Sequence, residues 1–428
     1  MQRMAMKKLK EWKTKKNRKP LILKGARQVG KTWLMKNFGA ACFKNVAYIN
    51  FDSNVRMRQI FEEDYDISRI LRMINIETGV KIRPEETLII FDEVQEAPKA
   101  ISSLKYFCEN APEYAVIAAG SLLGVAIHEG ISFPVGKVET MEIHPLSYHE
   151  FLLAMGEESL AELLEEKDYD VIRTFADRYI HWLKLYYFIG GMPEAVNDYA
   201  ENGDITVVRE IQKQILELYE QDFSKHTPNA ELARLRMVWN SVPLQLAKEN
   251  KKFFFGHLKQ GARAKDFELA IEWLLDCGLI GKVYRVEKPA VPLKAYVDFS
   301  AFKIYLLDVG LLGAMSDLDA RTILEGNQLF TEFKGALTEQ YVYQQIMAET
   351  EYTPYYFSAN SHTEIDFLIQ KEGTVTPVEV KAEENVKAKS LQAYCKKYRP
   401  SYAVRASMTN YREEDWMVNL PLYAIENL

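Results

Sequence analysis

The sequence predicts an α/β protein of several domains, with a parallel sheet flanked by helices in its N-terminal third. At 428 residues the chain is too long for one ordinary hydrophobic core, which favours roughly two to four domains. Four short segments with apolar runs, LILKG (21–25), NVAYINF (45–51), TLIIFDEVQ (87–95) and YAVIAAGS (114–121), alternate with helix-forming segments. This alternation is typical of strands that lie parallel in one sheet with helices on both faces. Hydrophobic residues make up 48% of the chain, as expected for a globular protein.

The charge of the chain argues against a protein whose whole surface binds nucleic acid. The formal net charge is −6 at pH 7, and charged residues make up 27% of the chain. Local basic patches stay open, because residues 1–20 hold nine Lys or Arg and a single acidic residue.

No segment of the sequence indicates export. No apolar run is long enough for a secretory signal or a membrane-spanning helix. The four cysteines, Cys42, Cys108, Cys277 and Cys395, are widely spaced and lack the spacing of a metal site. We therefore expect a cytoplasmic protein with reduced, mostly buried thiols and no membrane contact.

The first candidate site is a glycine loop between a predicted strand and a predicted helix. Residues 25–32, GARQVGKT, match the pattern G-x-x-x-x-G-K-[ST]. The glycines let the backbone wrap a phosphate, with N–H groups at the helix start directed at the anion. Lys31 would reach the β- and γ-phosphates, and the Thr32 hydroxyl would bind Mg²⁺. The alternative is a glycine-rich loop with a solvent-exposed lysine. The residues expected to contact ATP are Gly25, Ala26, Arg27, Gln28, Val29, Gly30, Lys31, Thr32 and Trp33.

The second part of this site follows the apolar run at 87–91. A strand buried on both faces should read as such a continuous run, and this one ends in Asp92 and Glu93. We expect Asp92 to hold Mg²⁺ through water and Glu93 to orient or deprotonate the attacking water. The alternative is a solvated pair of acids at the end of a strand.

Four phrases in order resemble the AAA-type P-loop ATPases of prokaryotes that carry a C-terminal domain of unknown function. They are GARQVGKT, IIFDEVQ, AAGSLLG and GKVETMEIHPLSYHEF, the last at 136–151. The resemblance implies ATP hydrolysis with Mg²⁺, and it places Ser121 where a polar residue senses the γ-phosphate. A plain helix-capping serine is the alternative there. The family usually has Gly-Arg where this chain has Gly136 and Lys137, and lysine cannot make the forked contact of arginine. We therefore assign no arginine finger.

The middle of the chain is predicted to be helical. Residues 190–196, GGMPEAV, match the family signature GG-x-PEA; the double glycine would end one helix, and Pro193 fits the first turn of the next. The resemblance implies a helical lid beside the nucleotide, and a helical linker without a catalytic part is the alternative. Residues 226–298 show helices followed by a hairpin, as in a winged helix.

Basic residues mark the second helix of this winged-helix-like segment. Lys259, Arg263 and Lys265 lie at its predicted start, where such folds contact DNA. The alternatives are an ordinary solvated face and a winged helix that binds only protein.

The C-terminal third resembles the restriction-endonuclease-like fold, often written PD-(D/E)XK. Residues 301–315 match the family phrase K-x-Y-x-x-D-x-GLL, and 333–349 form a predicted amphipathic helix that carries Glu339. Three strand-like segments follow, within residues 354–381. The order helix, strand, strand, strand, with an acid on the helix, Asp on one strand and Glu-x-Lys on the next, underlies the resemblance.

The hairpin at 363–381 places the acidic residues of this fold opposite one another. A four-residue loop at 371–374 pairs Gln370 with Val375, and Asp366 then lies opposite Glu379. Strand alternation puts Lys381 on the same face as these two acids.

Two facing carboxylates repel each other, and a divalent cation between them would reverse the sign of this interaction. We therefore predict a second Mg²⁺ or Mn²⁺ held by Glu339, Asp366 and Glu379. Asp366, Glu379 and Lys381 would act on a phosphodiester, with Lys381 stabilising the developing charge. Three alternatives stay open: a catalytically inactive relic, a solvated face, and a register slip of one residue that would separate the pair.

These observations support four domains and two hypotheses of function. The expected domains are a P-loop ATPase domain at 1–150, a helical lid at 151–225, a winged-helix-like domain at 226–298 and a nuclease-like domain at 299–428. The first hypothesis is an ATPase whose nucleotide state controls a C-terminal module that binds or cuts DNA or RNA. The second is a nucleotide-dependent switch whose C-terminal half binds a protein partner and cuts nothing. A nucleotide kinase is disfavoured, because the acidic pair suits water better than a substrate hydroxyl.

Overall fold

The structure is a computed structural model that divides into two compact units. It describes residues 2–121, 133–227, 229–248, 251–325, 331–359, 363–382 and 388–428. The N-terminal unit comprises residues 2–144 and 276–278, and the C-terminal unit comprises residues 145–275 and 279–428. The segments expected as lid, winged helix and nuclease-like domain therefore fall into one unit, apart from residues 276–278. No helix in the described ranges is both long enough and apolar enough to cross a membrane.

The N-terminal unit is built on a parallel sheet of five strands in the order β2-β3-β4-β1-β5. The strands are β1 (Leu21–Lys24), β2 (Asn45–Asn50), β3 (Thr87–Asp92), β4 (Ala115–Ala119) and β5 (Glu139–Glu142). Every residue of β3 is buried, as its continuous apolar run predicts. The prediction of a parallel α/β sheet in this part of the chain is confirmed.

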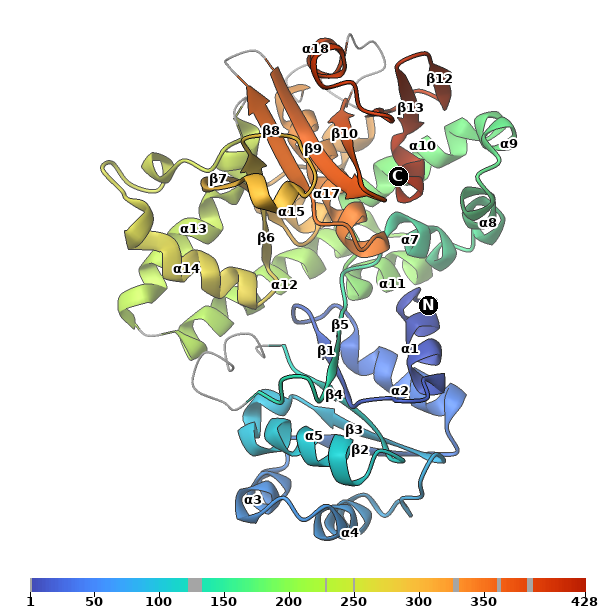
Figure 1. Cartoon of the computed structure of the whole chain (residues 1–428), viewed down its shortest axis with the longest axis vertical. Coiled ribbons are helices and arrows are strands. Elements are labelled where there is room, and N and C mark those ends of the chain that lie inside the picture. Colours follow the sequence, from blue (N-terminus) through green and yellow to red (C-terminus); the bar gives the residue numbers. More distant parts are fainter. Residues whose placement is uncertain are drawn as a thin grey trace. The chain divides into compact units, whose positions relative to one another are not determined.

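Helices cover both faces of this sheet (Figure 1). They are α1 (Ala5–Thr14), α2 (Lys31–Cys42), α3 (Val55–Glu63), α4 (Ile67–Thr78) and α5 (Pro98–Asn110), with a short 3₁₀ turn, η1 (Val94–Glu96), after β3. One face packs against α3, α4 and α5 through alternate strand residues such as Ile89 and Phe91. The other face packs against α2, on which α1 lies. The carboxyl ends of β1, β3 and β4 therefore meet at one edge of the sheet.

The C-terminal unit begins with a run of helices. They are α7 (Tyr148–Ala154), α8 (Glu158–Glu166), α9 (Tyr169–Thr174), α10 (Ala176–Ile189), α11 (Pro193–Asn202), α12 (Ile205–His226), α13 (Asn229–Ala247) and α14 (Ala264–Asp276), with the 3₁₀ turn η2 (Phe255–His257) before α14. Helix α7 begins with a capping box, in which Ser147 and Glu150 each bond the other's backbone N–H. The prediction of a helical middle segment is confirmed by these elements.

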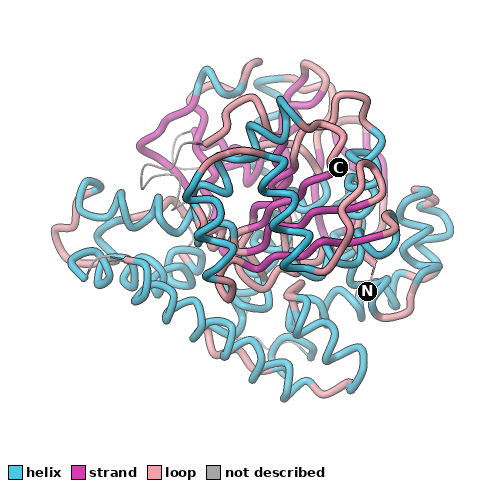
Figure 2. Tube along the Cα trace, turned by 90° about the horizontal axis from the view of Figure 1, so that it is seen from below, coloured by secondary structure: helices cyan, strands magenta, loops and turns pink. Residues whose placement is uncertain are grey.

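An eight-stranded mixed sheet follows, in the order β12-β13-β11-β10-β9-β8-β6-β7. Its strands are β6 (Ile280–Val286), β7 (Val297–Leu306), β8 (Tyr355–Ala359), β9 (Thr363–Lys371), β10 (Thr374–Val380), β11 (Val404–Ser407), β12 (Arg412–Glu414) and β13 (Met417–Pro421). The helices among them are α15 (Val309–Met315), α16 (Ala320–Glu325), α17 (Thr331–Glu349) and α18 (Lys389–Tyr398), with the 3₁₀ turns η3 (Leu293–Tyr296) and η6 (Leu422–Asn427). Figure 2 marks the helices, strands and loops along the chain and shows helices beside strands.

The hairpin expected as the wing of a winged helix belongs to this large sheet. Strands β6 and β7 pair antiparallel, and β6 also pairs in parallel with β8, which comes about seventy residues later in the chain. A separate winged-helix domain is therefore not confirmed. The basic residues Lys259, Arg263 and Lys265 are exposed near the start of α14.

The double glycine of the helical segment serves the packing of the C-terminal unit. The Gly191 N–H donates a hydrogen bond of 2.6 Å to Asp308, and the Gly191 carbonyl accepts one of 2.7 Å from Leu146. A Cβ on Gly191 would lie 2.0 Å from the Leu146 carbonyl oxygen. Asp308 also caps α15 through the Leu311 N–H. The signatures GG-x-PEA and K-x-Y-x-x-D therefore meet in one buried contact, while a lid beside the nucleotide remains a prediction.

The hairpin formed by β9 and β10 has the predicted register but a shorter turn. Val375 pairs with Gln370, as predicted, and Lys371 pairs directly with Thr374. The turn is therefore Glu372 and Gly373 alone, with φ of 48° and 77°. Two residues with positive φ form the type of turn whose twist matches that of antiparallel strands, which explains why two suffice in place of the expected four.

Candidate active site

The glycine loop of residues 25–30 lies between β1 and α2, and its backbone requires glycine at two positions. Gly25 has a φ of +138°, and a Cβ there would lie 2.2 Å from the Ile143 carbonyl oxygen. Gly30 has a φ of +90° and precedes α2, which begins at Lys31. Glycine adopts these conformations without steric cost. The loop therefore ends at the start of α2, where free backbone N–H groups and the helix dipole favour an anion.

Lys31 carries a positive charge into this loop. Its ammonium donates hydrogen bonds to the carbonyl oxygens of Gly25, at 2.8 Å, and Ala26, at 2.6 Å. Burial lowers the pKa of Lys31 to about 8, although the nearby charges of Glu93 and Asp92 act in the opposite direction. A phosphate would offer this ammonium a full negative charge in place of two neutral carbonyl groups. Lys31 thus has the position and the charge that a phosphate ligand requires.

The other predicted loop residues differ in exposure. Val29 is buried, and its carbonyl accepts a hydrogen bond of 3.0 Å from Arg3. Gln28 adopts a positive φ of 64°, and its side-chain oxygen is buried without a partner among the described residues. Trp33, in the first turn of α2, is 41% exposed, so its indole is accessible to a ligand.

Thr32 and Asp92 form the oxygen-rich part of the site. The Thr32 hydroxyl donates a hydrogen bond of 2.7 Å to the Asp92 carboxylate, which is buried at the end of β3. The Tyr48 hydroxyl donates a second one, of 2.9 Å, to the same carboxylate oxygen. A hydroxyl and a carboxylate beside a phosphate loop are ligands that suit Mg²⁺, so these residues fit the expected ion.

Sequence reasoning missed Tyr48. The signal that points to it is the presence of two residues with polar groups, Tyr48 and Asn50, in the last half of strand β2, next to the strand that ends in Asp92. Pairing of β2 with β3 places Asn50 beside Asp92.

Glu93 has a strained backbone and a polar neighbourhood. Its φ is +50°, which is uncommon for a residue with a side chain, and strain of this kind concentrates at functional sites. One of its carboxylate oxygens accepts hydrogen bonds from Gln95, at 2.7 Å, and from the Ser121 hydroxyl, at 3.4 Å. Arg27 donates a hydrogen bond of 3.2 Å to the Ser121 hydroxyl. The structure therefore links the glycine loop, the end of β4 and Glu93 through side chains.

Lys137, the residue that replaces the family arginine, is engaged elsewhere. Its ammonium forms an ion pair of 2.8 Å with Glu109, and both side chains are partly exposed. The hydrogen bond and charge of Glu109 raise the pKa of Lys137. The three residues that follow Ser121 in the resemblance, 122–124, lie outside the described residues.

The predicted C-terminal residues also come together, but around lysines. Glu339 on α17 is buried, and it accepts hydrogen bonds from Lys251, from Lys303 at 3.1 Å and from the Tyr305 hydroxyl. Burial disfavours ionisation of Glu339, but the two lysines outweigh it and lower its pKa to about 2. Lys303 is fully buried and lies 4.0 Å from the Asp366 carboxylate.

The two acids of the hairpin have different partners. Asp366 accepts a hydrogen bond of 2.8 Å from the Val380 N–H, and burial, together with the charge of Glu339, raises its pKa to about 7. Glu379 is buried and pairs with Lys381 at 2.9 Å through one oxygen; its other oxygen has no hydrogen-bond partner among the described residues.

This donor set does not fit the expected second Mg²⁺ or Mn²⁺. In the part of the chain that the structure describes, no group of three or more His, Cys, Asp or Glu side chains is arranged to hold a metal ion. The physical reason is that both oxygens of Glu339 already accept from lysine ammonium groups. Sequence reasoning missed Lys251 and Lys303, although Lys303 is the first residue of the phrase K-x-Y-x-x-D.

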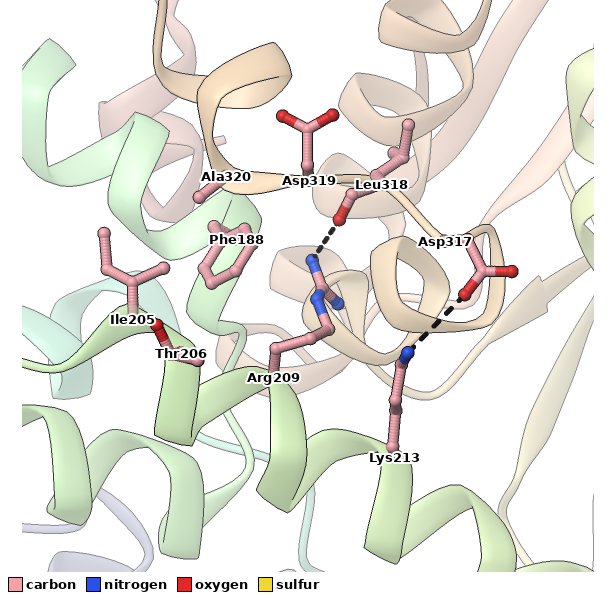
Figure 3. Close-up of a pocket in the computed structure, with 9 residues that line it drawn as sticks. All are labelled: Phe188, Ile205, Thr206, Arg209, Lys213, Asp317, Leu318, Asp319 and Ala320. Atoms are coloured by element: carbon pink, nitrogen blue, oxygen red, sulfur yellow. Dashed lines mark hydrogen bonds and ion pairs between the residues drawn. The ribbon is translucent and has the colours of Figure 1, made fainter.

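A separate cavity of about 320 Å³ lies in the C-terminal unit (Figure 3). Its lining residues are Phe188, Ile205, Thr206, Arg209, Lys213, Asp317, Leu318, Asp319 and Ala320. The Arg209 guanidinium donates to the Leu318 carbonyl at 2.8 Å and lies 4.3 Å from the centre of the Phe188 ring. Lys213 pairs with Asp317 at 3.8 Å. The charged groups of this cavity thus have partners within the protein, and we assign no chemistry to it.

Three family profiles match separate parts of the chain. Residues 17–152 match a family described as AAA domain. Residues 180–322 match a domain of unknown function, DUF8612, and residues 334–425 match another, DUF4143. No relative was found among the curated proteins. Because neither of the two later descriptions states a function, a winged-helix and a nuclease-like fold stay predictions.

Several solved structures are similar to the chain at low identity. The Walker-type ATPase PABY2304 of Pyrococcus abyssi is 15% identical, with a TM-score of 0.46, over 73% of this chain and 94% of that one. The ORC1 protein of Aeropyrum pernix, solved with DNA, is 13% identical, with a TM-score of 0.29, over 73% and 91%. DnaA of Aquifex aeolicus, solved with AMPPCP, is 14% identical, with a TM-score of 0.26, over 64% and 86%.

The assignment of the N-terminal unit depends on the profile match at 17–152 and on the geometry of the site. The glycine loop, the buried Lys31 and the bonded pair of Thr32 and Asp92 all lie within that range. Residues 17–152 match the AAA domain family and have the glycine loop typical of P-loop ATPase domains.

Proposed function

We propose that this protein binds ATP with Mg²⁺, hydrolyses it, and uses the nucleotide state to control its C-terminal unit. The observation that carries the proposal is the hydrogen-bonded pair of Thr32 and Asp92, 2.7 Å apart, at the start of the helix that follows the glycine loop. The Lys31 ammonium donates hydrogen bonds to two carbonyl groups of the same loop, and a bound phosphate would take their place as the acceptor.

Each side chain of the site has a role in this reaction. The backbone N–H groups of the glycine loop and Lys31 would bind the β- and γ-phosphates. Thr32 and Asp92 would hold Mg²⁺, which neutralises phosphate charge when bound. Tyr48 keeps the Asp92 carboxylate in place by a hydrogen bond. Together these groups would bind the triphosphate of ATP and its Mg²⁺.

Glu93 would accept the proton of the attacking water. Its carboxylate is oriented by Gln95 and Ser121, and general-base catalysis by a positioned carboxylate contributes roughly 10²–10⁴-fold to a rate. Arg27, bonded to Ser121, supplies a positive charge from within the same chain near this end of the loop. We therefore expect Arg27 to compensate for the lysine at position 137.

A turn from the second half of the chain supports coupling between nucleotide and C-terminal unit. Residues 276–278 join α14 to β6, yet they belong to the N-terminal unit. Gly278 lies so close to the glycine loop that a Cβ on it would be 3.2 Å from the Ala26 nitrogen. A shift of the loop on phosphate binding would therefore reach this turn, and β6 continues from it after one residue.

Measurement of ATP turnover with and without Mg²⁺ tests the proposed function. We expect Mg²⁺-dependent release of phosphate from ATP by the wild-type chain, and no measurable turnover by Lys31→Ala. The matched control is Lys44→Ala, because Lys44 pairs with Glu86 at the surface of the same unit and should keep full activity. Full turnover by Lys31→Ala, or none by the wild type, would refute the proposal.

A further inference from the structure

We propose that Lys303 is the built-in cation of the C-terminal acidic cluster: its ammonium occupies the place of the expected divalent metal ion, and the domain therefore lacks metal-dependent nuclease activity. This inference is independent of ATP hydrolysis, because all of its residues lie in the C-terminal unit.

Three carboxylates from two elements surround the Lys303 ammonium. The Nζ atom lies 3.1 Å from an oxygen of Glu339, 2.7 Å from one of Glu364 and 4.0 Å from one of Asp366. It also lies 5.0 Å from the centre of the Tyr356 ring, over which a cation is attracted. Lys303 itself is 0% exposed, so this charge is compensated by the protein and not by water.

The ammonium and a divalent ion exclude each other at this place. Mg²⁺ and Mn²⁺ sites use carboxylate and other oxygen ligands, at roughly 2.0–2.1 Å for Mg²⁺. One oxygen of Glu339 already accepts from Lys303 and Tyr305, and the other accepts from Lys251. The lone pairs that would bind the metal are thus used by N–H and O–H donors, and a nearby ammonium would repel a divalent cation.

Charge balance supports the same conclusion. Three lysines, Lys251, Lys303 and Lys381, lie among four carboxylates, which belong to Glu339, Glu364, Asp366 and Glu379. A divalent ion added to this cluster would leave an excess of positive charge in a buried place, which is unfavourable.

The family phrase K-x-Y-x-x-D gains a physical meaning from this arrangement. Lys303 and Tyr305 lie two residues apart on β7, so strand alternation places both side chains on the same face, toward Glu339. The third residue, Asp308, holds the double glycine. Lys303 thus links β7 to α17 and β9 through ion pairs. Lys303 and Tyr305 both donate hydrogen bonds to Glu339, the acid that was predicted to bind a metal ion.

The test measures Mn²⁺ binding by the full-length protein in the absence of nucleotide. Binding is followed as a loss of the electron paramagnetic resonance signal of free Mn²⁺. Every variant also carries Asp92→Asn, which removes the carboxylate of the P-loop site. We expect no Mn²⁺ binding by this background and none by added Lys303→Arg, which keeps the charge. Added Lys303→Met should create a Mn²⁺ site, and Mn²⁺ should raise the melting temperature of that variant alone.

Two results would overturn the inference. The first is that the Asp92→Asn background binds Mn²⁺ and that adding Asp366→Asn or Glu379→Gln abolishes this binding. The oxygen of Glu379 that has no hydrogen-bond partner among the described residues would then take part in a metal site. The second is a folded Lys303→Met variant that binds no Mn²⁺. If Lys303→Met does not fold, the background protein still decides, together with plasmid and single-stranded DNA incubated with Mg²⁺ or Mn²⁺. We expect the background protein to cleave neither nucleic acid. Cleavage by the background protein that is lost on adding Asp366→Asn would contradict the proposal.

Discussion

At the scale of single residues, Lys31 shows how the glycine loop is prepared for an anion. Its ammonium is buried and held by the carbonyl groups of Gly25 and Ala26, which are weaker partners than a phosphate. Burial is the main cause of its lowered pKa. In the folded protein without ligand, Lys31 therefore binds a proton less strongly than in the unfolded chain, and bound phosphates should reverse this.

The first prediction concerns pH. Because the pKa of Lys31 is about 8, the affinity for ATP should fall as the pH rises from 7 to 10, and binding in that range should take up protons. The folded-state pKa lies below the value of 10.5 for a free lysine, so this residue destabilises the ligand-free fold below about pH 8, and the penalty disappears as the pH rises toward 10.5. Calorimetry in buffers of different ionisation enthalpy measures the proton uptake. Lys31→Arg keeps its charge over this range, so its affinity should not change with pH in this way. An equal decline in that variant would assign the effect to another group.

The second prediction concerns Tyr48, which sequence reasoning did not place in the site. Tyr48→Phe removes the hydrogen bond to Asp92 but keeps the ring, over which the Lys36 ammonium lies at 3.9 Å. A hydrogen bond to a charged group is worth about 1.5–3 kcal/mol. We expect the Mg²⁺ concentration for half-maximal ATP turnover to rise by roughly tenfold, as measured by titration with Mg²⁺. Tyr65→Phe is the control, since Tyr65 stacks on Tyr106 away from this carboxylate, and a similar rise in it would contradict the assignment.

At the scale of elements, the sequence pattern predicted those strands and turns that depend on residues close together in the chain. The continuous apolar run before Asp92 marked a strand buried on both faces, and the hairpin register followed from strand alternation and a tight turn. The pairing of β6 with β8 was not predictable in this way, because its partners are far apart in sequence. Lys303 was missed for the same reason: its burial and its three carboxylates depend on elements that meet only in the folded sheet.

The third prediction concerns the double glycine between α10 and α11. Gly190 has a φ of +74°, and a Cβ there would lie 2.1 Å from an Asp308 carboxylate oxygen. Gly203 has a similar φ of +69° but no atom within 4 Å of a Cβ, so it is the matched control. We expect Gly190→Ala to lower the free energy of unfolding by about 2–4 kcal/mol more than Gly203→Ala, from backbone strain and overpacking. Denaturant unfolding followed by circular dichroism measures the difference. Equal effects would show that the contact with Asp308 tolerates a side chain.

At the scale of the whole molecule, a short turn ties the second half of the chain to the nucleotide site. Residues 276–278 pack with the N-terminal unit, while α14 before them and β6 after them contribute to the C-terminal unit. The proposed coupling would therefore run along the chain, from this turn into β6. Nothing in the sequence predicts that this turn packs with the N-terminal unit, since Asp276-Cys277-Gly278 has the pattern of an ordinary helix end.

The fourth prediction concerns this turn. Gly278→Ala should weaken ATP binding by several-fold, because its Cβ would press on the Ala26 nitrogen, and its φ of +70° adds strain. Gly79→Ala is the matched control in the same unit, with a φ of +67° and open space around a Cβ. Fluorescence of a labelled ATP analogue measures affinity in both. An unchanged affinity in Gly278→Ala with a normal fold would remove the support for coupling through this turn, while ATP hydrolysis itself would stand.

We propose above all that Glu93 activates the water that hydrolyses ATP, while Lys31, Thr32 and Asp92 hold the nucleotide and its Mg²⁺. The most direct measurement follows the conversion of bound ATP in a single turnover, comparing the wild type with Glu93→Gln. We predict that both bind ATP with equal affinity and that Glu93→Gln releases phosphate at least about 100-fold more slowly. The control is Glu96→Gln, at a carboxylate that pairs with Arg58 nearby, and it should react at the wild-type rate. Equal rates of phosphate release in the wild type and Glu93→Gln would contradict the claim.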